Sequence, residues 1–213
     1  MIYISEFAPE TVKNAFCGAV FVKNNPALSG GIASHPDMHM CLFRDGTAIF
    51  SRPGEVSGEY PESIGFNAVC LDRYFIHNLK YTNPRVLKAA EERGIQLVNV
   101  RQGYTKCSCV VPDGKSVITA DRGIARVLSG LGDVEVLTVS PGHVVLSGYD
   151  YGFLGGASGL ADGVLWFAGD LSRHPDFDKI MDFLDRREIA VRWFPDIPLT
   201  DVGSIIQTRR EIR

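Results

Sequence analysis

Short apolar stretches alternate with tight polar turns along this chain, and several of the turns carry the dipeptide Asp-Gly. Asp-Gly between two alternating apolar runs favours a β-hairpin, because the tight turn needs a positive φ that glycine adopts without steric cost. These turns are Asp45-Gly46, Asp113-Gly114 and Asp162-Gly163. The pattern therefore predicts hairpins of similar design at three places in the chain.

Residues in front of these turns repeat as well. Four positions before the aspartates stand Cys41, Cys109 and Ser158, and six positions before them stand His39, Cys107 and Gly156. Polar, small and reactive residues thus recur at the start of each hairpin's first strand. Such regularity is typical of a fold built from repeated units.

The unit predicted from the hydrophobic periodicity is strand, hairpin turn, strand, helix, strand. Its clearest copy has strands at 106–111, 116–119 and 134–139, and a helix at 122–128 that Asp121 caps. The other two complete copies keep this order, with elements at 67–71, 74–77, 84–93 and 95–100, and at 153–160, 164–168, 175–186 and 189–194.

The two ends of the chain supply a fourth unit if they pair with each other. Pairing of the ends would close the units into a ring and remove exposed sheet edges. The strand, strand, helix and strand of this unit are predicted at 201–207, 1–5, 9–16 and 19–23.

A fifth hairpin is predicted at 38–43 and 47–50, with the Gly- and Pro-broken stretch 52–60 where its helix would stand. The predicted fold class is therefore α/β, a single domain over residues 1–213. It contains five strand-strand-helix-strand modules, one degenerate and one split between the termini.

The amino-acid composition and net charge argue against some classes of binding partner. Hydrophobic content of 45% and charged content of 22% are those of a globular protein, and the net charge of −3 comes without a Lys/Arg block. We therefore expect no nucleic acid and no membrane as partners. The first residues lack the basic and apolar regions of a signal peptide, and five cysteines are an odd number, so we expect a cytoplasmic protein with free thiols.

Five such modules around a pseudo-fivefold axis resemble the pentein, or guanidine-modifying enzyme, fold. This superfamily includes arginine deiminases, dimethylargininases, agmatine deiminases, amidinotransferases and a non-catalytic ribosome anti-association factor. The segment 34–40, Ser-His-Pro-Asp-Met-His-Met, is similar to the family's His-x-Asp element. Segments 60–78, 103–121 and 148–159 resemble an uncharacterised bacterial branch of the superfamily. The resemblance implies a five-module α/β-propeller with a central pocket.

The resemblance also implies a set of catalytic residues. His35 would be the acid/base and Asp37 would anchor a planar guanidinium cation. The family's nucleophile is a Cys near the C-terminus that opens an inner strand, but here 155–158 and 201–204 contain none. Cys107 and Cys109 stand at the corresponding start of another module and are the replacement candidates, since a thiolate is a strong nucleophile. Of the two, Cys107 is the predicted nucleophile.

Other residues at strand starts are candidates for ligand binding. If 35–39 were a strand, the side chains of alternate residues would point into one pocket, and Cys107 and Cys109 would share a face in the same way. Together these side chains would also make a mixed zinc site, but no paired CxxC spacing is present and we predict neither metal nor cofactor. The candidate ligand-binding residues are His39, Cys109, Gly156, Ser158, Asp201 and Ser204.

Each candidate also has a purely structural interpretation. Free cysteine is among the most buried residue types, so Cys107 and Cys109 are equally expected as packing residues. Cys17, Cys41 and Cys70 are expected as packing residues only. The tripeptide His-Pro-Asp at 35–37 reads as a capped loop, and its second copy at 174–176 stands at a predicted helix start as a cap.

Two functions remain open from the sequence. The first is a hydrolase or transferase that acts on a guanidino or amidino small molecule through Cys107, His35 and Asp37. The alternative is a non-catalytic ring that binds a small cationic ligand or a macromolecule. A sulfur of Cys107 within about 4 Å of a His35 ring nitrogen in a concave pocket would favour catalysis, and a thiol buried away from any cavity would oppose it.

Overall fold

The computed structural model describes residues 1–212, and it is a mixed α/β structure. Its α-helices are short, which suits connections between neighbouring strands. Over the described residues the α-helices are α1 (Glu10–Ala15), α2 (Pro36–His39), α3 (Pro84–Glu92), α4 (Thr105–Ser108), α5 (Arg122–Ser129) and α6 (Phe177–Asp185). Single 3₁₀ turns lie at Gly30–Ile32, Glu62–Ile64, Leu79–Tyr81 and Leu171–Arg173. No helix in this part of the chain is long and apolar enough to cross a lipid bilayer.

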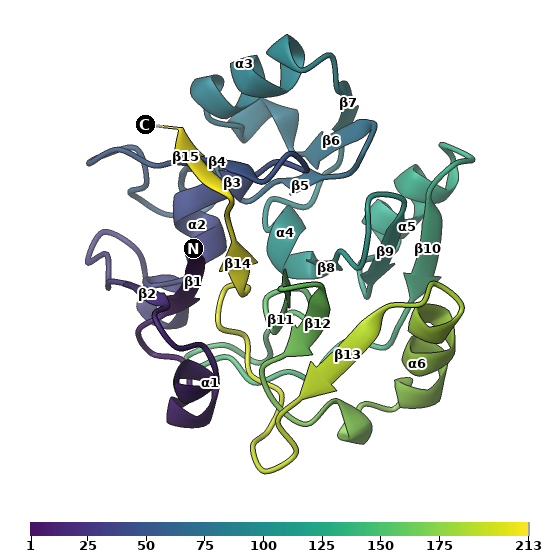
Figure 1. The fold of residues 1–213 in the computed structure, drawn as a ribbon. Coiled ribbons are helices and arrows are strands. Elements are labelled where there is room, and N and C mark those ends of the chain that lie inside the picture. Colours follow the sequence, from purple (N-terminus) through teal and green to yellow (C-terminus); the bar gives the residue numbers. More distant parts are fainter. Residues whose placement is uncertain (213) are drawn as a thin grey trace.

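The described strands form five sheets of three strands each, with the orders β14-β1-β2, β15-β4-β3, β5-β6-β7, β10-β9-β8 and β11-β12-β13. Figure 1 shows these sheets distributed around the middle of the molecule. The strands are β1 (Ile2–Ser5), β2 (Val20–Val22), β3 (Met40–Leu42), β4 (Thr47–Phe50), β5 (Val69–Cys70), β6 (Tyr74–His77), β7 (Gln96–Asn99), β8 (Cys109–Val110), β9 (Ser116–Thr119), β10 (Glu135–Thr138), β11 (Ser158–Ala161), β12 (Val164–Phe167), β13 (Ala190–Trp193), β14 (Ile206–Gln207) and β15 (Arg210–Ile212).

The structure confirms the predicted Asp-Gly hairpins. Strands β3 and β4, β8 and β9, and β11 and β12 pair antiparallel on either side of the three turns. At the last turn both Asp162 (φ 50°) and Gly163 (φ 76°) take the left-handed conformation that a tight two-residue hairpin requires. In three modules the second strand then pairs in parallel with a third strand, after helix α3, α5 or α6. The predicted order of elements is therefore correct for these modules.

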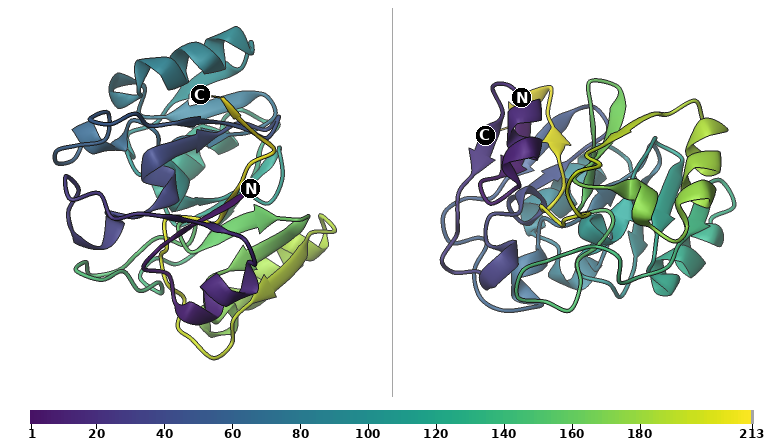
Figure 2. Two further views of the ribbon diagram at one scale, coloured as in Figure 1. Left: turned by 60° about the vertical axis from the view of Figure 1, so that its left-hand side comes forward. Right: turned by 90° about the horizontal axis from the view of Figure 1, so that it is seen from below.

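Pairing of the chain ends is confirmed as well. β1 pairs antiparallel with β14 and parallel with β2, so the two ends share one sheet, and the left view of Figure 2 shows them side by side. The sequence did not predict β15, which pairs in parallel with β4 and supplies the third strand of the module that lacks a helix. Residues 52–60 contain no helix, as expected.

All five predicted first strands begin later than expected, and two of them are preceded by a helical turn. Residues 36–39 form α2 and residues 105–108 form α4, whereas β11 starts only at Ser158. Pro36 favours the helical turn because its fixed φ suits the first helical position. The strand-alternation argument for 35–39 and for Cys107 with Cys109 is therefore wrong.

Apolar side chains pack in clusters between each sheet and the helix beside it. The cluster around α3 joins Val86 and Ala90 to Phe75 of β6, and the cluster around α6 joins Ile180 and Phe183 to neighbouring strands. The starts of the inner strands β3, β5, β8, β11 and β14 lie toward the middle of the molecule in Figure 1. Polar side chains meet at that place.

Candidate functional site

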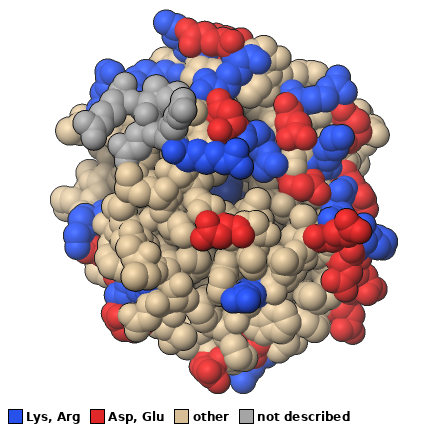
Figure 3. Space-filling view, viewed as in Figure 1, with Lys and Arg blue, Asp and Glu red and all other residues tan. Residues whose placement is uncertain are grey.

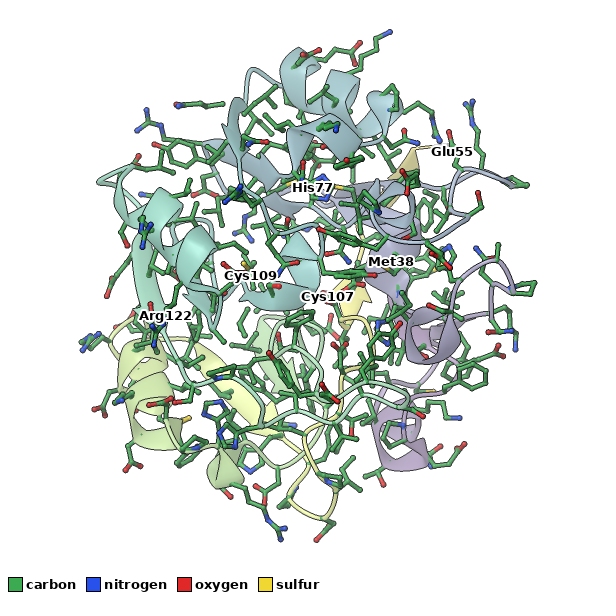
Figure 4. The ribbon with its side chains drawn as sticks, turned by 180° about the vertical axis from the view of Figure 1, so that it is seen from behind. Met38, Glu55, His77, Cys107, Cys109 and Arg122 are labelled. Carbon is green, nitrogen blue, oxygen red and sulfur yellow. The ribbon has the colours of Figure 1, made fainter. Side chains whose placement is uncertain are left out.

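Each inner strand is preceded by a residue that reaches the middle of the molecule, and these residues form a buried layer. We call them the central layer: Asp37 before β3, Asn67 before β5, Cys107 before β8, Gly155 and Gly156 before β11, and Ser204 before β14. Figure 4 shows Cys107 near the middle, seen from behind. The layer thus draws on all five sheets.

Hydrogen bonds between neighbouring modules link the central layer into a closed circuit. The Lys106 amide donates to the Asn67 carbonyl at 3.1 Å, and the Gly156 amide donates to the Cys107 carbonyl at 2.8 Å. The next two links are the Ser204 amide to the Gly156 carbonyl at 2.7 Å, and the Asp37 amide to the Gly203 carbonyl at 3.1 Å. The Asn67 amide side chain closes the circuit on the Asp37 carbonyl at 3.3 Å. Buried backbone groups are thereby satisfied between modules rather than by water.

Asp37 is the acceptor at the centre of this layer and is fully buried. Its carboxylate accepts from Asn67 Nδ2 at 3.1 Å, Cys107 Sγ at 3.1 Å and Ser204 Oγ at 2.7 Å. Helix α2 directs it there, because Asp37 lies in the first turn of that helix. The alternative of a loop aspartate bonded to nearby amides is therefore wrong for this residue.

Asn67 holds α4 in place from the neighbouring module. Its Oδ1 accepts from the amides of Lys106 at 2.8 Å and Cys107 at 3.2 Å, which are orphan donors at the start of the helix. Its Nδ2 donates to Cys107 Sγ at 3.2 Å as well as to Asp37. Asn67 is a site residue that was not predicted from the sequence. Its position at the start of a predicted module was the available signal.

The Cys107 thiol is a hydrogen-bond donor in a closed environment. The residue is only 3% exposed, and its sulfur donates to Asp37 Oδ2. Burial raises the pKa of the Cys107 thiol well above its ordinary value, and the negative charges of Asp37 and Asp201 raise it further. The hydrogen bond from Asn67 opposes this but does not reverse it. The sulfur is therefore a protonated thiol at neutral pH.

His35 and Asp201 form a second buried pair beside the layer. His35 Nδ1 has no hydrogen-bond partner among the described atoms and lies 3.7 Å from Asp201 Oδ1. Burial lowers the pKa of His35, so the ring is neutral at physiological pH. Burial also raises the pKa of Asp201 to about 6, although its carboxylate accepts from the amides of Phe153 and Gly203.

Lys106 brings a positive charge to this region and was not foreseen as a site residue. Its ammonium donates to Ser204 Oγ at 2.9 Å and to the Gly155 carbonyl at 3.5 Å. Ser204 has a φ of +71°, an uncommon value for a residue with a side chain, which aims its hydroxyl at Asp37. Lys106 is thus connected to the Asp37 carboxylate through a single hydroxyl.

The structure brings together some of the predicted site residues and separates others. His35, Asp37, Cys107, Gly156, Asp201 and Ser204 meet in or beside the central layer. Ser158 lies next to the layer and donates to the Gly155 carbonyl at 3.0 Å. Gly156 has to be a glycine here, because an added Cβ would lie 2.1 Å from Asp201 Oδ1.

His39 and Cys109 are not in the site. The His39 ring faces the Ala33 carbonyl at 3.3 Å, at the end of α2, and makes no hydrogen bond to the central layer among the described residues. Cys109 is fully buried in an apolar cluster, where burial raises its pKa to about 12. Their assignment as ligand-binding residues fails with the strand alternation on which it rested.

The remaining cysteines and the second His-Pro-Asp tripeptide serve the fold. Cys41 and Cys70 are buried packing residues, as expected, but Cys17 is exposed, contrary to expectation. Asp176 occupies the N-cap position of α6 without a side-chain cap bond, and it binds the Ser140 amide at 2.7 Å instead. All five cysteines are free.

Among the described residues, one group could hold a metal ion. Ligand atoms of His35, Asp37 and Cys107 lie within 4.8 Å of one another, and all three residues are buried. The further zinc ligands considered from the sequence, His39 and Cys109, do not join them. Asn67 Nδ2 already donates to both the sulfur and the carboxylate, so these two atoms are satisfied by hydrogen bonds.

A cavity of about 280 Å³ opens beside the central layer. Its volume is near the lower limit of small-molecule sites, which is about 300 Å³. Lys106 belongs both to the cavity wall and to the contacts of the layer, so its ammonium lies at the inner end. Inner strands of four sheets contribute to the lining through Met40, Cys70, Leu160 and Gln207, and Val111, which directly follows β8, adds to it from the fifth module. Figure 3 shows a hollow near the middle of this face with Lys or Arg atoms in its depth.

Sequence comparison places the chain in a known family. A family model described as a family of unknown function, DUF6873, matches residues 53–206. The chain belongs to the DUF6873 family. The match includes Asn67, Cys107 and Ser204 of the central layer, whereas Asp37 precedes it. No curated protein and no solved structure matches the DUF6873 chain.

Proposed function

We propose that this DUF6873 protein is a pentein-like ring that binds a small molecule in its central cavity without catalysing a reaction. In this proposal the five three-stranded sheets are five modules around a pseudo-fivefold axis, and residues 1–213 are one domain. The circuit of hydrogen bonds through the central layer supports the ring, since each module is bonded to the next. The cytoplasm remains the compartment that we expect.

The state of Cys107 is the observation that carries the non-catalytic interpretation. A nucleophilic cysteine needs an accessible thiolate, usually beside an imidazolium or another positive charge. Here the sulfur is buried, the neighbouring charges are the carboxylates of Asp37 and Asp201, and the pKa of the thiol is raised. His35 is neutral and supplies no positive charge. The cavity lining includes Lys106, but Cys107 is not part of it.

Lys106 supports the same interpretation. In the enzymes that the sequence resembles, the aspartate of the His-x-Asp element anchors a guanidinium cation. In this chain the Lys106 ammonium is bonded to the hydroxyl that donates to Asp37. An internal cation therefore supplies the positive charge that a substrate would otherwise bring to this carboxylate.

A catalytic alternative rests on the clustering of His35, Asp37 and Cys107 within 4.8 Å. Hydrolysis through Cys107 would require the layer to open, so that the thiol leaves Asp37 and meets both substrate and a proton acceptor. The buried pair of His35 and Asp201 would be the acceptor.

A turnover assay tests the proposal. The protein is incubated with a panel of guanidino and amidino compounds, and ammonium release and product masses are followed. Cys107→Ser is the matched control, since its hydroxyl is also able to donate to Asp37. We expect no turnover by either protein. Turnover by the wild type that Cys107→Ser abolishes would overturn the proposal and support the hydrolase.

A further inference from the structure

We infer that the central cavity takes a small organic anion, bound through a carboxylate or phosphate group at Lys106. The inference rests on the proposed function and names the class of ligand. It also departs from the cationic ligand that the sequence suggested. The charges that line the cavity carry the argument.

The lining contains three cations and no carboxylate. Lys106 lies at the inner end, Arg44 and Arg209 also line the cavity, and no Asp or Glu within the described part of the chain belongs to the lining. Neighbouring carboxylates are already engaged, since Asp72 accepts from Arg44 at 3.3 Å and Asp162 accepts from Gln207 at 2.6 Å. Asp72 and Asp37 offset part of the charge of Arg44 and Lys106 from outside the cavity. Neither carboxylate belongs to the lining, so a cationic ligand would meet cations and no acceptor carboxylate there, whereas an anion would meet complementary charge.

Lys106 has a donor left for a ligand. An ammonium group has three N–H donors, and the contacts to Ser204 and Gly155 use two of them. The Asp37 carboxylate does not accept a hydrogen bond from the third N–H, because its oxygens are bonded to Asn67, Cys107 and Ser204. The third N–H is therefore available to an acceptor in the cavity, and a negatively charged acceptor gives the stronger bond.

The walls explain why the anion is organic. Above the ammonium the cavity is lined by side chains such as Leu42, Ala68, Leu160 and Ile205, which offer apolar surface. A ligand with a short apolar body would displace water from this surface while its charged group reaches Lys106. Inorganic anions would use only the inner end.

Binding of defined probes tests the inference. Phenyl phosphate, benzoate and inorganic phosphate serve as anions, with phenol as neutral and methylguanidine as cationic probes. Affinities are measured by isothermal titration calorimetry at constant ionic strength. We expect phenyl phosphate or benzoate to bind and phenol and methylguanidine not to bind. Inorganic phosphate binding more weakly than phenyl phosphate would support the contribution of the apolar walls.

Variants link the binding to the cavity. Lys106→Met keeps the length of the side chain but removes the ammonium, and we expect binding about tenfold weaker or more. Arg44 lines the cavity but lies outside the central layer, so Arg44→Gln removes a positive charge from the lining and leaves the layer intact. We expect this variant to bind the anions several-fold more weakly. Lys88→Met is the control, because Lys88 is an exposed residue of α3 paired with Glu92, and it should leave binding unchanged.

The outcomes separate the inference from the proposed function. Failure of every anion to bind, or anion binding that neither Lys106→Met nor Arg44→Gln weakens, would overturn the inference. Binding of phenol or methylguanidine in preference to the anions would overturn it too, while leaving a non-catalytic binding protein in place. Only turnover that depends on Cys107 would overturn the proposed function itself.

Discussion

Asn67 joins three parts of the central layer with a single side chain. Its oxygen accepts two amides of α4, and its nitrogen donates to the Asp37 carboxylate and the Cys107 sulfur. Removing the side chain leaves buried donors and acceptors without partners, and each such loss costs about 1–3 kcal/mol. Asn67 is thus the residue on which the geometry of the layer depends most directly.

The substitution Asn67→Ala is therefore expected to lower the free energy of unfolding by about 2–4 kcal/mol. Urea denaturation followed by circular dichroism measures this change. Asn24→Ala is the matched control, because Asn24 is exposed, and we expect it to stay within about 0.5 kcal/mol of the wild type. A similar small effect for both variants would show that the layer does not stabilise the fold.

Asp201 makes stability depend on pH. Its pKa is about 6 in the folded protein, against an ordinary value of 3.8, so the folded state holds the proton more tightly than the unfolded chain. The stability that this proton contributes is complete below about pH 4 and is lost as the pH rises through about 6. A shift of this size corresponds to on the order of 3 kcal/mol.

Comparison of the wild type with Asp201→Asn isolates this contribution. The wild type should lose about 3 kcal/mol of stability relative to the variant between about pH 4 and pH 7, because the other titrating groups are common to both proteins. Urea unfolding across this range measures the difference. A difference that stays constant with pH would mean that Asp201 titrates outside this range.

At the scale of elements, the close approach of two inner strands limits which residues fit. An added Cβ at Gly159 of β11 would lie 1.8 Å from the Ile205 carbonyl oxygen, just before β14. The clashing atom belongs to the backbone, which cannot move aside as the end of a flexible side chain can. Gly159→Ala should therefore cost about 3 kcal/mol or more, because the strands from two modules have to separate.

Gly54→Ala provides the contrast for this prediction. Gly54 has a φ of +84°, but nothing lies within 4 Å of an added Cβ, so we expect only the conformational cost of about 1 kcal/mol. Thermal unfolding of both variants by calorimetry compares the two costs. Equal costs would mean that β11 and β14 do not depend on this approach.

The elements also mark where sequence reasoning succeeded and where it failed. The hairpins were predictable because Asp-Gly turns and alternating apolar residues are local signals, and Asp121 caps α5 through the Ile124 amide at 2.8 Å as expected. The helical turn that contains Cys107 was not, because α4 depends on the side chain of Asn67 from another module. The pairing of β15 with β4 is equally remote in the sequence.

In the candidate site, too, local features were predictable from the sequence and contacts between modules were not. The sequence placed Cys107, His35, Asp37, Asp201 and Ser204 at strand starts, and they do meet. It could not indicate that the thiol would face two carboxylates instead of an imidazolium, since that depends on packing between modules. Lys106 escaped notice because lysine in a predicted strand is normally a solvent-exposed residue.

At the scale of the whole molecule, two different regions lie next to each other near the middle. The central layer is buried and hydrogen-bonded from module to module, and the cavity beside it is open and lined by cations. Lys106 belongs to both, because its backbone is bonded to Asn67 and its ammonium faces the cavity. Ligand binding at the cavity would therefore stabilise the folded protein, by an amount that rises with the logarithm of the ratio of ligand concentration to dissociation constant.

The most direct test of the account is the rate at which iodoacetamide alkylates Cys107 in the native protein, followed by peptide mass spectrometry at about pH 8. Exposed Cys17 is the internal control for reagent and pH. The account predicts that Cys17 is modified at least about 100-fold faster, and that Cys107 reacts readily only in concentrated urea. Modification of Cys107 in the folded protein as fast as Cys17 would contradict a sealed, non-catalytic thiol.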